Sequence, residues 1–303
     1  MAEEGGTAAE EAEVEQEPVA ALTEEEAEVR KQVWEAVFED CPADKAKLAS
    51  VTERKANAQE GIQAFAYSEV DFATVSHIIN LLKNQHTNLY AGKGIFCDLG
   101  SGVGKACVAA GLCHPWEKVI GIEMLQSLTD EAMAANVKYQ ENEQPEGYVK
   151  PECQFIKGDF VAELATHLEP IAPSLNVVLA VATCYGAEQL GAMAALAEKM
   201  ADNSIFVTIS QELPDSVIGG DKKLPAERYR DRLKEALAVR GTDPASVDID
   251  PSPPDEKPGG WRQVHSEKIQ LAWGSTVLFV FKKLPLPEEP KPEGEEAPPP
   301  ADE

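Results

Sequence analysis

A short apolar segment that runs directly into a glycine-rich turn constrains the fold of this chain more than any other feature. Residues 94–105 read GIFCDLGSGVGK, so an apolar strand precedes three glycines at alternate positions, and a helical stretch follows. Glycine lets the backbone turn tightly and approach a ligand closely, and the N-terminus of the following helix points at that ligand. The segment predicts a ligand-binding turn, with a plain tight turn as the alternative.

The spacing of these glycines separates two classes of nucleotide ligand. In a dinucleotide-binding fingerprint the third small residue comes five positions after the first, where this chain has Lys105, and Gly104 is one position early. The spacing therefore counts against an NAD-dependent oxidoreductase. An acidic residue just before the first glycine, here Asp98, is instead what sites for S-adenosylmethionine (SAM) resemble, where no pyrophosphate has to be bound.

From residue 94 onward, short apolar strands alternate with helices, which predicts a mostly parallel sheet covered on both faces. The five expected crossover strands lie at 95–99, 119–123, 154–157, 177–183 and 204–210. The helices expected between them include 103–112, 125–139 and 187–200. Strands at 267–272 and 276–282 predict a terminal hairpin. The expected fold is a doubly wound, seven-stranded α/β sheet whose last strand runs antiparallel.

Charge and composition predict four regions. Residues 1–29 contain eleven Glu and no Lys or Arg, and residues 285–303 contain seven acidic residues against one Lys, so the two ends carry 17 of the 26 net negative charges. Such segments predict disordered tails. Thr23 and Glu26 form a capping box for a helix expected over 24–39, and further helices are expected over 44–59 and from Phe72. The expected regions are an acidic tail at 1–22, a helical lead-in with a cofactor loop at 23–92, an α/β domain at 93–284 and a Pro/Glu-rich tail at 285–303.

A long connection at about 212–263 joins the fifth strand to the hairpin. A helix expected over 226–240 is rich in Lys and Arg, whereas residues 243–260 are acidic and contain five prolines. Connections of this length in compact domains are commonly functional, for example as active-site lids. The alternative is an exposed insertion whose charges only form a solvated face.

The acidic composition limits the partners of the chain. A formal net charge of −26 argues against tight direct binding to DNA, because such binding needs a predominantly basic surface. The tails either keep the protein soluble or bind a basic partner such as a histone tail. The six cysteines form no C-x-x-C pair and have no His at metal-ligand spacing, which predicts reduced thiols and no metal site. The lack of a long apolar run and the acidic N-terminus predict a soluble intracellular protein without a membrane segment.

Polar residues fall where predicted strands end, and open parallel sheets bind ligands at those ends. Glu123 ends the second strand, where its carboxylate can accept hydrogen bonds from two ribose hydroxyls or can simply face solvent. Asp159 can accept a hydrogen bond from an adenine amino group, and Phe160 can cover the ring. Thr183 and Tyr185 follow the fourth strand. Tyr185 either walls a substrate channel, as the one candidate catalytic residue, or only packs.

With these segments assembled, the chain resembles the class I SAM-dependent methyltransferases and, within them, the disruptor-of-telomeric-silencing (Dot1-like) histone lysine methyltransferases. Residues 67–72 (YSEVDF) are similar to the family's YGETSF loop, which touches the methionine end of SAM. Residues 98–104 (DLGSGVG) match the family's central loop residue for residue. Residues 121–123 (GIE) resemble its Gly-Val-Glu, and residues 158–160 its Gly-Asp-Phe. The resemblance covers about residues 65–213.

The resemblance implies methyl transfer from SAM to a protein lysine, on a histone or another basic protein. It also implies a set of cofactor-binding residues: Tyr67, Ser68, Glu69, Val70, Asp98, Gly100, Ser101, Gly102, Gly104, Lys105, Glu123, Asp159, Phe160 and Thr183. The chain departs from the family pattern at Ser68 for Gly, Val70 for Thr, Lys105 for Gln and Val181 for Asn. These departures keep two alternatives open: a non-catalytic SAM-binding scaffold and a small-molecule methyltransferase.

Overall fold

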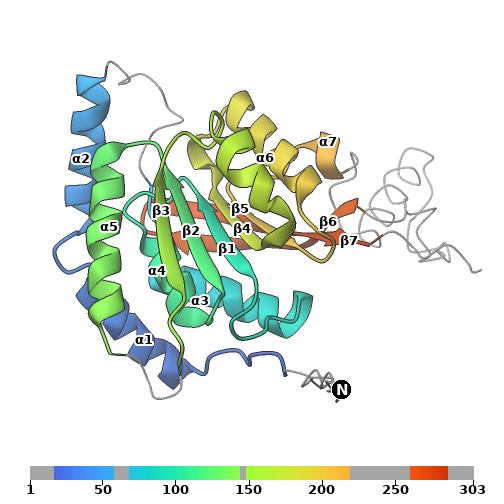
Figure 1. The fold of residues 1–303 in the computed structure, drawn as a ribbon, viewed down its shortest axis with the longest axis horizontal. Helices are drawn as coiled ribbons and strands as arrows, with labels where there is room; N and C mark the ends of the chain where they lie inside the picture. Colours follow the sequence, from blue (N-terminus) through green and yellow to red (C-terminus); the bar gives the residue numbers. More distant parts are fainter. Residues whose placement is uncertain (1–16, 58–67, 144–147, 219–259, 286–303) are drawn as a thin grey trace, which may run out of the picture.

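In the computed structural model, the described part of the chain comprises residues 17–57, 68–143, 148–218 and 260–285. Seven strands form one sheet in the order β3-β2-β1-β4-β5-β7-β6 (Figure 1). Strands β1 to β5 pair in parallel, and β7 runs antiparallel to both β5 and β6. The strands are β1 (Ile95–Leu99), β2 (Lys118–Glu123), β3 (Glu152–Lys157), β4 (Leu175–Val181), β5 (Ile205–Ile209), β6 (Gly260–Leu271) and β7 (Gly274–Leu284). The predicted doubly wound, seven-stranded sheet is confirmed.

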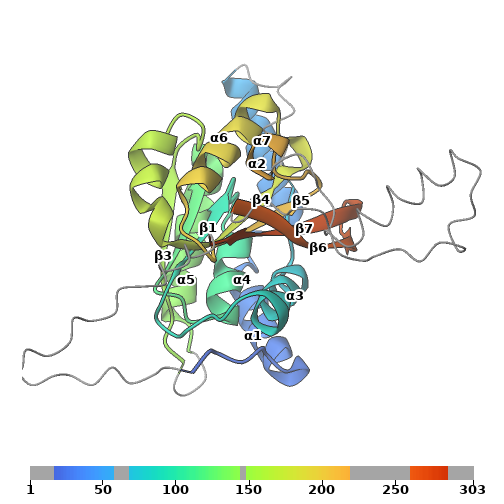
Figure 2. The ribbon, with the colours of Figure 1, turned by 90° about the vertical axis from the view of Figure 1, so that its right-hand side faces the viewer.

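Helices cover both faces of this sheet (Figures 1 and 2). On one face α3, α4 and α5 pack against the strands, and α1 and α2 contact those helices from outside. On the other face lie α6 and α7. The helices are α1 (Glu24–Val37), α2 (Ala43–Ala56), α3 (Phe72–Leu81), α4 (Lys105–Cys113), α5 (Gln126–Glu141), α6 (Ala187–Lys199) and α7 (Asp215–Ile218).

The interior strand β1 contributes side chains to two cores, one on each face of the sheet. All five of its side chains are buried, as expected of a parallel strand with helices on both faces. Successive side chains of a strand point to opposite faces. Accordingly, Phe96 joins the core under α4 and α5, whereas Cys97 and Leu99 join the core under α6.

A capping box stabilises the start of α1, and a buried arginine at its middle binds it to α4. The predicted capping box is present, because Glu26 N donates to Thr23 Oγ1 at 3.2 Å and Thr23 N donates to Glu26 Oε2 at 2.8 Å. Arg30 is buried, and its guanidinium donates to the carbonyl oxygen of Leu112 in the last turn of α4. A cation is favourable at a helix C-terminus. The lead-in helix therefore packs directly on the helix that follows the glycine loop.

Some predicted boundaries differ from those of the structure. The fourth strand ends at Val181, because Ala182–Cys184 form a 3₁₀ turn. The hairpin strand β6 begins at Gly260, so the long connection ends before the predicted residue 263. Helix α3 continues into a π-helical turn, Leu82–His86. The predicted helix at 226–240, the acidic segment up to residue 259 and most of both tails lie outside the described residues.

Gly104 sets where α4 begins. Its φ of +82° is left-handed, and a Cβ at this position would lie 2.7 Å from the ring of Phe155. The helix consequently starts at Lys105 and not at the predicted residue 103.

We expect Gly104→Ala to lower the free energy of unfolding by about 2–4 kcal/mol, since left-handed strain and overpacking add. Urea unfolding followed by circular dichroism measures the change. The matched control is Gly191→Ala, because Gly191 lies in α6 with open space around it. This control should be stabilised by about 0.5–1 kcal/mol. A Gly104→Ala variant as stable as the wild type would contradict the packing described for this loop.

Candidate active site

The glycine loop between β1 and α4 is anchored to the neighbouring strand. Gly100 N and Ser101 N both donate to the carbonyl oxygen of Ile122, each at 2.9 Å. The backbone then turns through Gly102 and Gly104, which have positive φ like Gly100. The loop therefore lies at the carboxyl edge of the sheet, between the ends of β1 and β2.

A pocket opens at this edge, beside the point where the strand order reverses between β1 and β4. It encloses about 680 Å³ of space between protein atoms, open solvent included. Its lining residues come from four strand ends, two helices and the segment before α3: Ser68, Gly100, Gly102, Ile122, Glu123, Met124, Leu125, Leu128, Gly158, Asp159, Phe160, Val181, Tyr185 and Gln189.

The carboxylate of Glu123 is held in this pocket by backbone donors. Gly102 N donates to Oε2 at 2.9 Å, and Leu125 N donates to Oε1 at 2.8 Å. Burial raises the pKa of Glu123. Each carboxylate oxygen keeps acceptor capacity beyond one hydrogen bond, so the group can still receive two ligand hydroxyls.

Asp159 and Phe160 follow β3 on the same side of the pocket. Asp159 Oδ1 accepts a hydrogen bond from Val161 N at 2.9 Å. The Phe160 side chain is buried, and its ring centroid lies 5.4 Å from that of Tyr185. An acceptor beside an aromatic face is an arrangement that suits a purine ring.

Tyr185 packs over the glycine loop. Its hydroxyl donates to the carbonyl oxygen of Leu99, and a Cβ on Gly100 would lie 2.6 Å from that hydroxyl. Burial, with Asp98 and Glu123 nearby, raises the pKa of Tyr185. The hydroxyl therefore stays protonated and fixes the loop, while the ring forms part of the pocket wall.

A second hollow adjoins the pocket at the end of β1. Its lining residues are Ser68, Glu69, Val70, Asp98, Gly100, Ser101, Gly102, Val103, Lys105, Ala106 and Val181. Asp98 is 3% exposed, and its Oδ1 has no hydrogen-bond partner among the described residues. Burial, and secondarily the charge of Glu123, raises the pKa of Asp98 to about 7. The other oxygen, Oδ2, accepts only from the thiol of Cys107, at 4.0 Å. A buried carboxylate with so little compensation suits a cationic ligand group.

The structure brings most of the predicted site residues to these two hollows, and Thr183 to neither. The Thr183 hydroxyl lies 2.9 Å from Ser210 Oγ, which in turn lies 2.8 Å from Thr276 Oγ1. Gly104 caps α4 beside Phe155. Tyr67 is outside the described residues.

Several residues near the pocket were missed from the sequence. Met124 and Leu128 line it. The place of Met124 directly after Glu123 is a signal that could have found it, whereas Leu128 lies in the first turn of α5. Gln189 lies on α6, and no motif marks it. Gln211 donates to the carbonyl oxygens of Ala182 and Tyr185, so it holds the turn after β4.

Other features of the described residues bear on the predicted class. No group of three or more His, Cys, Asp or Glu side chains in the described segments can hold a metal ion. Across the same segments, no helix combines the length and the apolar character needed to cross a bilayer. All six cysteines are free, and five of them are buried.

A seven-stranded sheet with an antiparallel hairpin, and a glycine loop followed by an acidic residue at the end of β2, define the class I SAM-dependent methyltransferases. The model of the family "Histone methylation protein DOT1" matches residues 49–210. This match spans more than half of the chain, so the protein belongs to the DOT1 family. Its cofactor is SAM.

Solved methyltransferase structures are similar to this chain at low identity. An O-methyltransferase from Bacillus cereus, in complex with SAH, is 12% identical with a TM-score of 0.42, over 85% of this chain and 100% of that one. The M1A22 tRNA methyltransferase TrmK from B. subtilis is 12% identical with a TM-score of 0.38, over 71% of this chain and 66% of that one, just under two thirds of its length. No curated protein matches the chain.

The raised pKa of Asp98 predicts a pH dependence of stability. Unfolded Asp ionises near pH 3.9, whereas folded Asp98 keeps its proton to about pH 7. Between these values the unfolded state binds fewer protons, so the free energy of unfolding falls as pH rises. From pH 5 to pH 8 we expect the ligand-free wild type to lose about 2–3 kcal/mol more than Asp98→Asn, as measured by urea unfolding. Equal losses in the two proteins would contradict this account.

Proposed function

We propose that this protein transfers the methyl group of SAM to the side-chain amine of a lysine in a basic protein, with a histone as the first substrate to test. The observation that carries the proposal is the meeting of Glu123, Asp159 and Phe160 with the DLGSGVG loop in one pocket. The DOT1 family membership supports the lysine acceptor.

The proposed roles follow the chemistry of each group. Glu123 accepts hydrogen bonds from the ribose hydroxyls, because its carboxylate is held facing the pocket by Gly102 N. Asp159 accepts from the adenine amino group, and Phe160 covers the ring. Glu69 and Asp98 lie at the second hollow and face the methionine end. These two carboxylates complement the positive charges of SAM.

When bound, SAM supplies a methyl group activated by a sulfonium. The protein's task is then to align the acceptor and to keep it uncharged. Val181, Phe160 and the Tyr185 ring give the pocket apolar walls, and an apolar environment disfavours a charged lysine amine. Alignment alone can contribute several powers of ten to the rate. If the lysine amine enters the site uncharged, it can attack the methyl group without a general base.

The charge of the chain favours a basic substrate. The formal net charge is −26 at pH 7, so a lysine-rich protein is attracted over long range. The attraction weakens with salt, because exposed charges are screened.

The first test is calorimetric titration with SAM. We expect a Glu123→Ala, Asp159→Ala double variant to lose at least about 100-fold in affinity, since each carboxylate makes charge-assisted hydrogen bonds. The matched control is a Glu152→Ala, Asp202→Ala double variant, which removes one exposed Glu and one exposed Asp outside the pocket. Unaltered SAM binding in the first double variant would remove the proposed site.

The second test identifies the acceptor. Labelled SAM is incubated with purified core histones, with whole lysate proteins and with a protein-depleted extract. We expect label on lysine side chains of a basic protein, and its loss in Asp159→Ala. Label only in the protein-depleted extract would instead support a small-molecule methyltransferase.

A specific observation supports a second candidate, a SAM-binding scaffold without catalysis. Val181 lines both hollows at the end of β4, where the family pattern has Asn. A hydrophobic side chain there cannot hydrogen-bond an incoming amine. SAM binding that depends on Glu123 and Asp159, without methyl transfer to any of the three acceptor pools, would favour this candidate.

A further inference from the structure

A polar hollow lies at the edge of the sheet opposite the pocket at the glycine loop. Strands β1 and β5 begin at this edge, and the antiparallel β7 ends there, since Ile205 of β5 pairs with Lys282. The hollow encloses about 910 Å³ of space between protein atoms, open solvent included. One of its walls is the π-helical turn that continues α3, and such turns are rare and frequent at functional sites. None of the described residues that line this hollow lines either hollow of the active site.

Lysines and amides line this hollow, although the formal net charge of the chain is −26. Lys83 and Lys282 contribute two positive charges, and none of the lining residues in the described segments is acidic. Four side-chain amides are exposed there and have no hydrogen-bond partner among the described residues: those of Asn84, Gln85, Asn88 and Asn203. An amide both donates and accepts hydrogen bonds. The site, called the basic hollow below, therefore combines positive charge with groups that bind hydroxyls.

Both ammonium groups of the basic hollow keep donors that the fold does not use. Lys83 Nζ donates to the carbonyl oxygens of Ala20 and Cys113, each at 3.0 Å. Lys282 Nζ donates to the carbonyl oxygen of His86 at 2.7 Å. Because an ammonium has three N–H donors, one of Lys83 and two of Lys282 remain. Neither ammonium forms an ion pair within the part of the chain that the structure describes.

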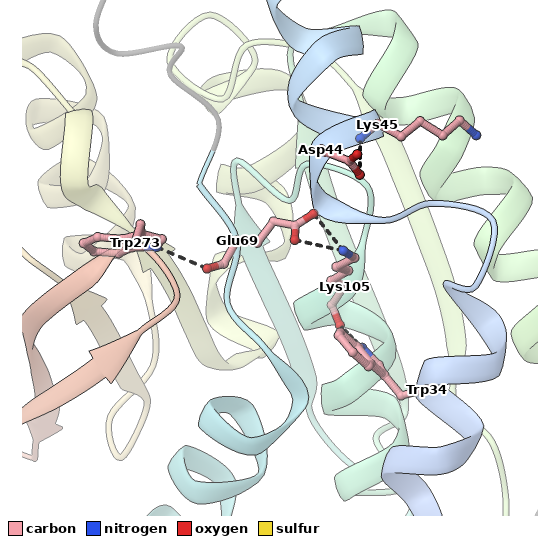
Figure 3. Close-up of polar contacts among 6 residues, drawn as sticks. All are labelled: Trp34, Asp44, Lys45, Glu69, Lys105 and Trp273. Carbon is pink, nitrogen blue, oxygen red and sulfur yellow. Dashed lines mark hydrogen bonds and ion pairs between the residues drawn. The ribbon is translucent and has the colours of Figure 1, made fainter.

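The buried lysine at the active-site edge is paired differently. Lys105 Nζ lies 2.8 Å from each carboxylate oxygen of Glu69, and Figure 3 shows the two side chains pointing toward each other. Burying an ammonium away from an anion disfavours its charged form. Accordingly, burial lowers the pKa of Lys83 to about 8. An anion in the basic hollow would supply the negative charge that no contact of Lys83 supplies.

We propose that the basic hollow binds a sugar phosphate, whose phosphate is received by Lys83 and Lys282 and whose hydroxyls are received by the side-chain amides. A phosphate dianion matches the charge of two ammonium groups, and its oxygens accept charge-assisted hydrogen bonds. The net charge of the chain repels a long polyanion such as DNA, which favours a small ligand. The inference is independent of the proposed function, because it concerns a separate site.

Calorimetric titration of the full chain with ribose 5-phosphate, ribose and inorganic phosphate tests this proposal. These probes lack adenine, so they do not imitate the adenosine part of SAM. We expect one ribose 5-phosphate to bind per chain, at least about 10-fold more tightly than either fragment, because only the whole ligand engages both the lysines and the amides. A saturating concentration of S-adenosylhomocysteine should leave this affinity unchanged.

Variants then separate the two halves of the site. Lys282→Gln should weaken ribose 5-phosphate and inorganic phosphate alike, by about 10- to 100-fold. Asn203→Gly removes an amide at a residue whose φ of +67° suits glycine, so it should weaken ribose 5-phosphate and leave inorganic phosphate unchanged. The matched control is Lys283→Gln, which removes the next lysine of β7. Lys283 also donates to helix carbonyl oxygens but does not line the hollow, so this variant should bind as the wild type does.

Four results would overturn the proposal. The first is no saturable binding of ribose 5-phosphate, and the second is its displacement by S-adenosylhomocysteine. The third is an equal loss of affinity in Lys282→Gln and Lys283→Gln, which would reduce the effect to the net charge of the chain. The fourth is tighter binding of a phosphoserine peptide than of ribose 5-phosphate, which would assign the hollow to a protein partner. Circular dichroism melting of each variant shows that a lost affinity does not come from a lost fold.

Discussion

The carbonyl oxygen of Ile122 is the acceptor on which the geometry of the site depends. It receives the backbone N–H groups of both Gly100 and Ser101, so the end of β1 is joined to the end of β2 at one point. The next residue, Glu123, is placed by the same register, and its carboxylate returns to the loop at Gly102. Tyr185 then closes over Gly100 from β4. Three neighbouring strand ends are thus joined by a few hydrogen bonds to backbone groups at the end of β1 and in the loop, and no side chain of the loop takes part.

Features that rest on contiguous residues could be predicted from the sequence. The β1 strand, the glycine loop and the place of Glu123 and Asp159 at strand ends follow from apolar runs interrupted by polar residues. The turn after β4 could not be predicted, because residues 182–184 continue an apolar pattern although they form a 3₁₀ turn. A pattern of residue types therefore predicts the presence of a strand more reliably than the residue at which the strand ends.

Contacts between segments that are distant in the sequence could not be predicted from residue patterns. The Lys105–Glu69 pair joins positions 36 residues apart, and the Trp273 hydrogen bond to Glu69 joins positions 204 apart. In the sequence, Lys105 is only a departure from a family pattern, and Trp273 is only part of a hairpin turn. Their meeting depends on how α1, α4 and the hairpin pack around the segment before α3. The geometry of the methionine end is therefore a property of the tertiary fold.

The site contains acidic side chains that do not stabilise the ligand-free fold, and their electrostatics suggest why. Asp98 and Glu123 both have pKa values raised chiefly by burial, and the charge of Glu123 adds to the cost of ionising Asp98. In a fold selected for stability alone, a neutral side chain at either position would be better. A cation in the pocket reverses this balance, since it favours the ionised form of every carboxylate near it. The buried carboxyls thus lower the stability of the fold when the pocket is empty, and a positively charged ligand restores it. SAM, which has a sulfonium and an ammonium, meets that requirement.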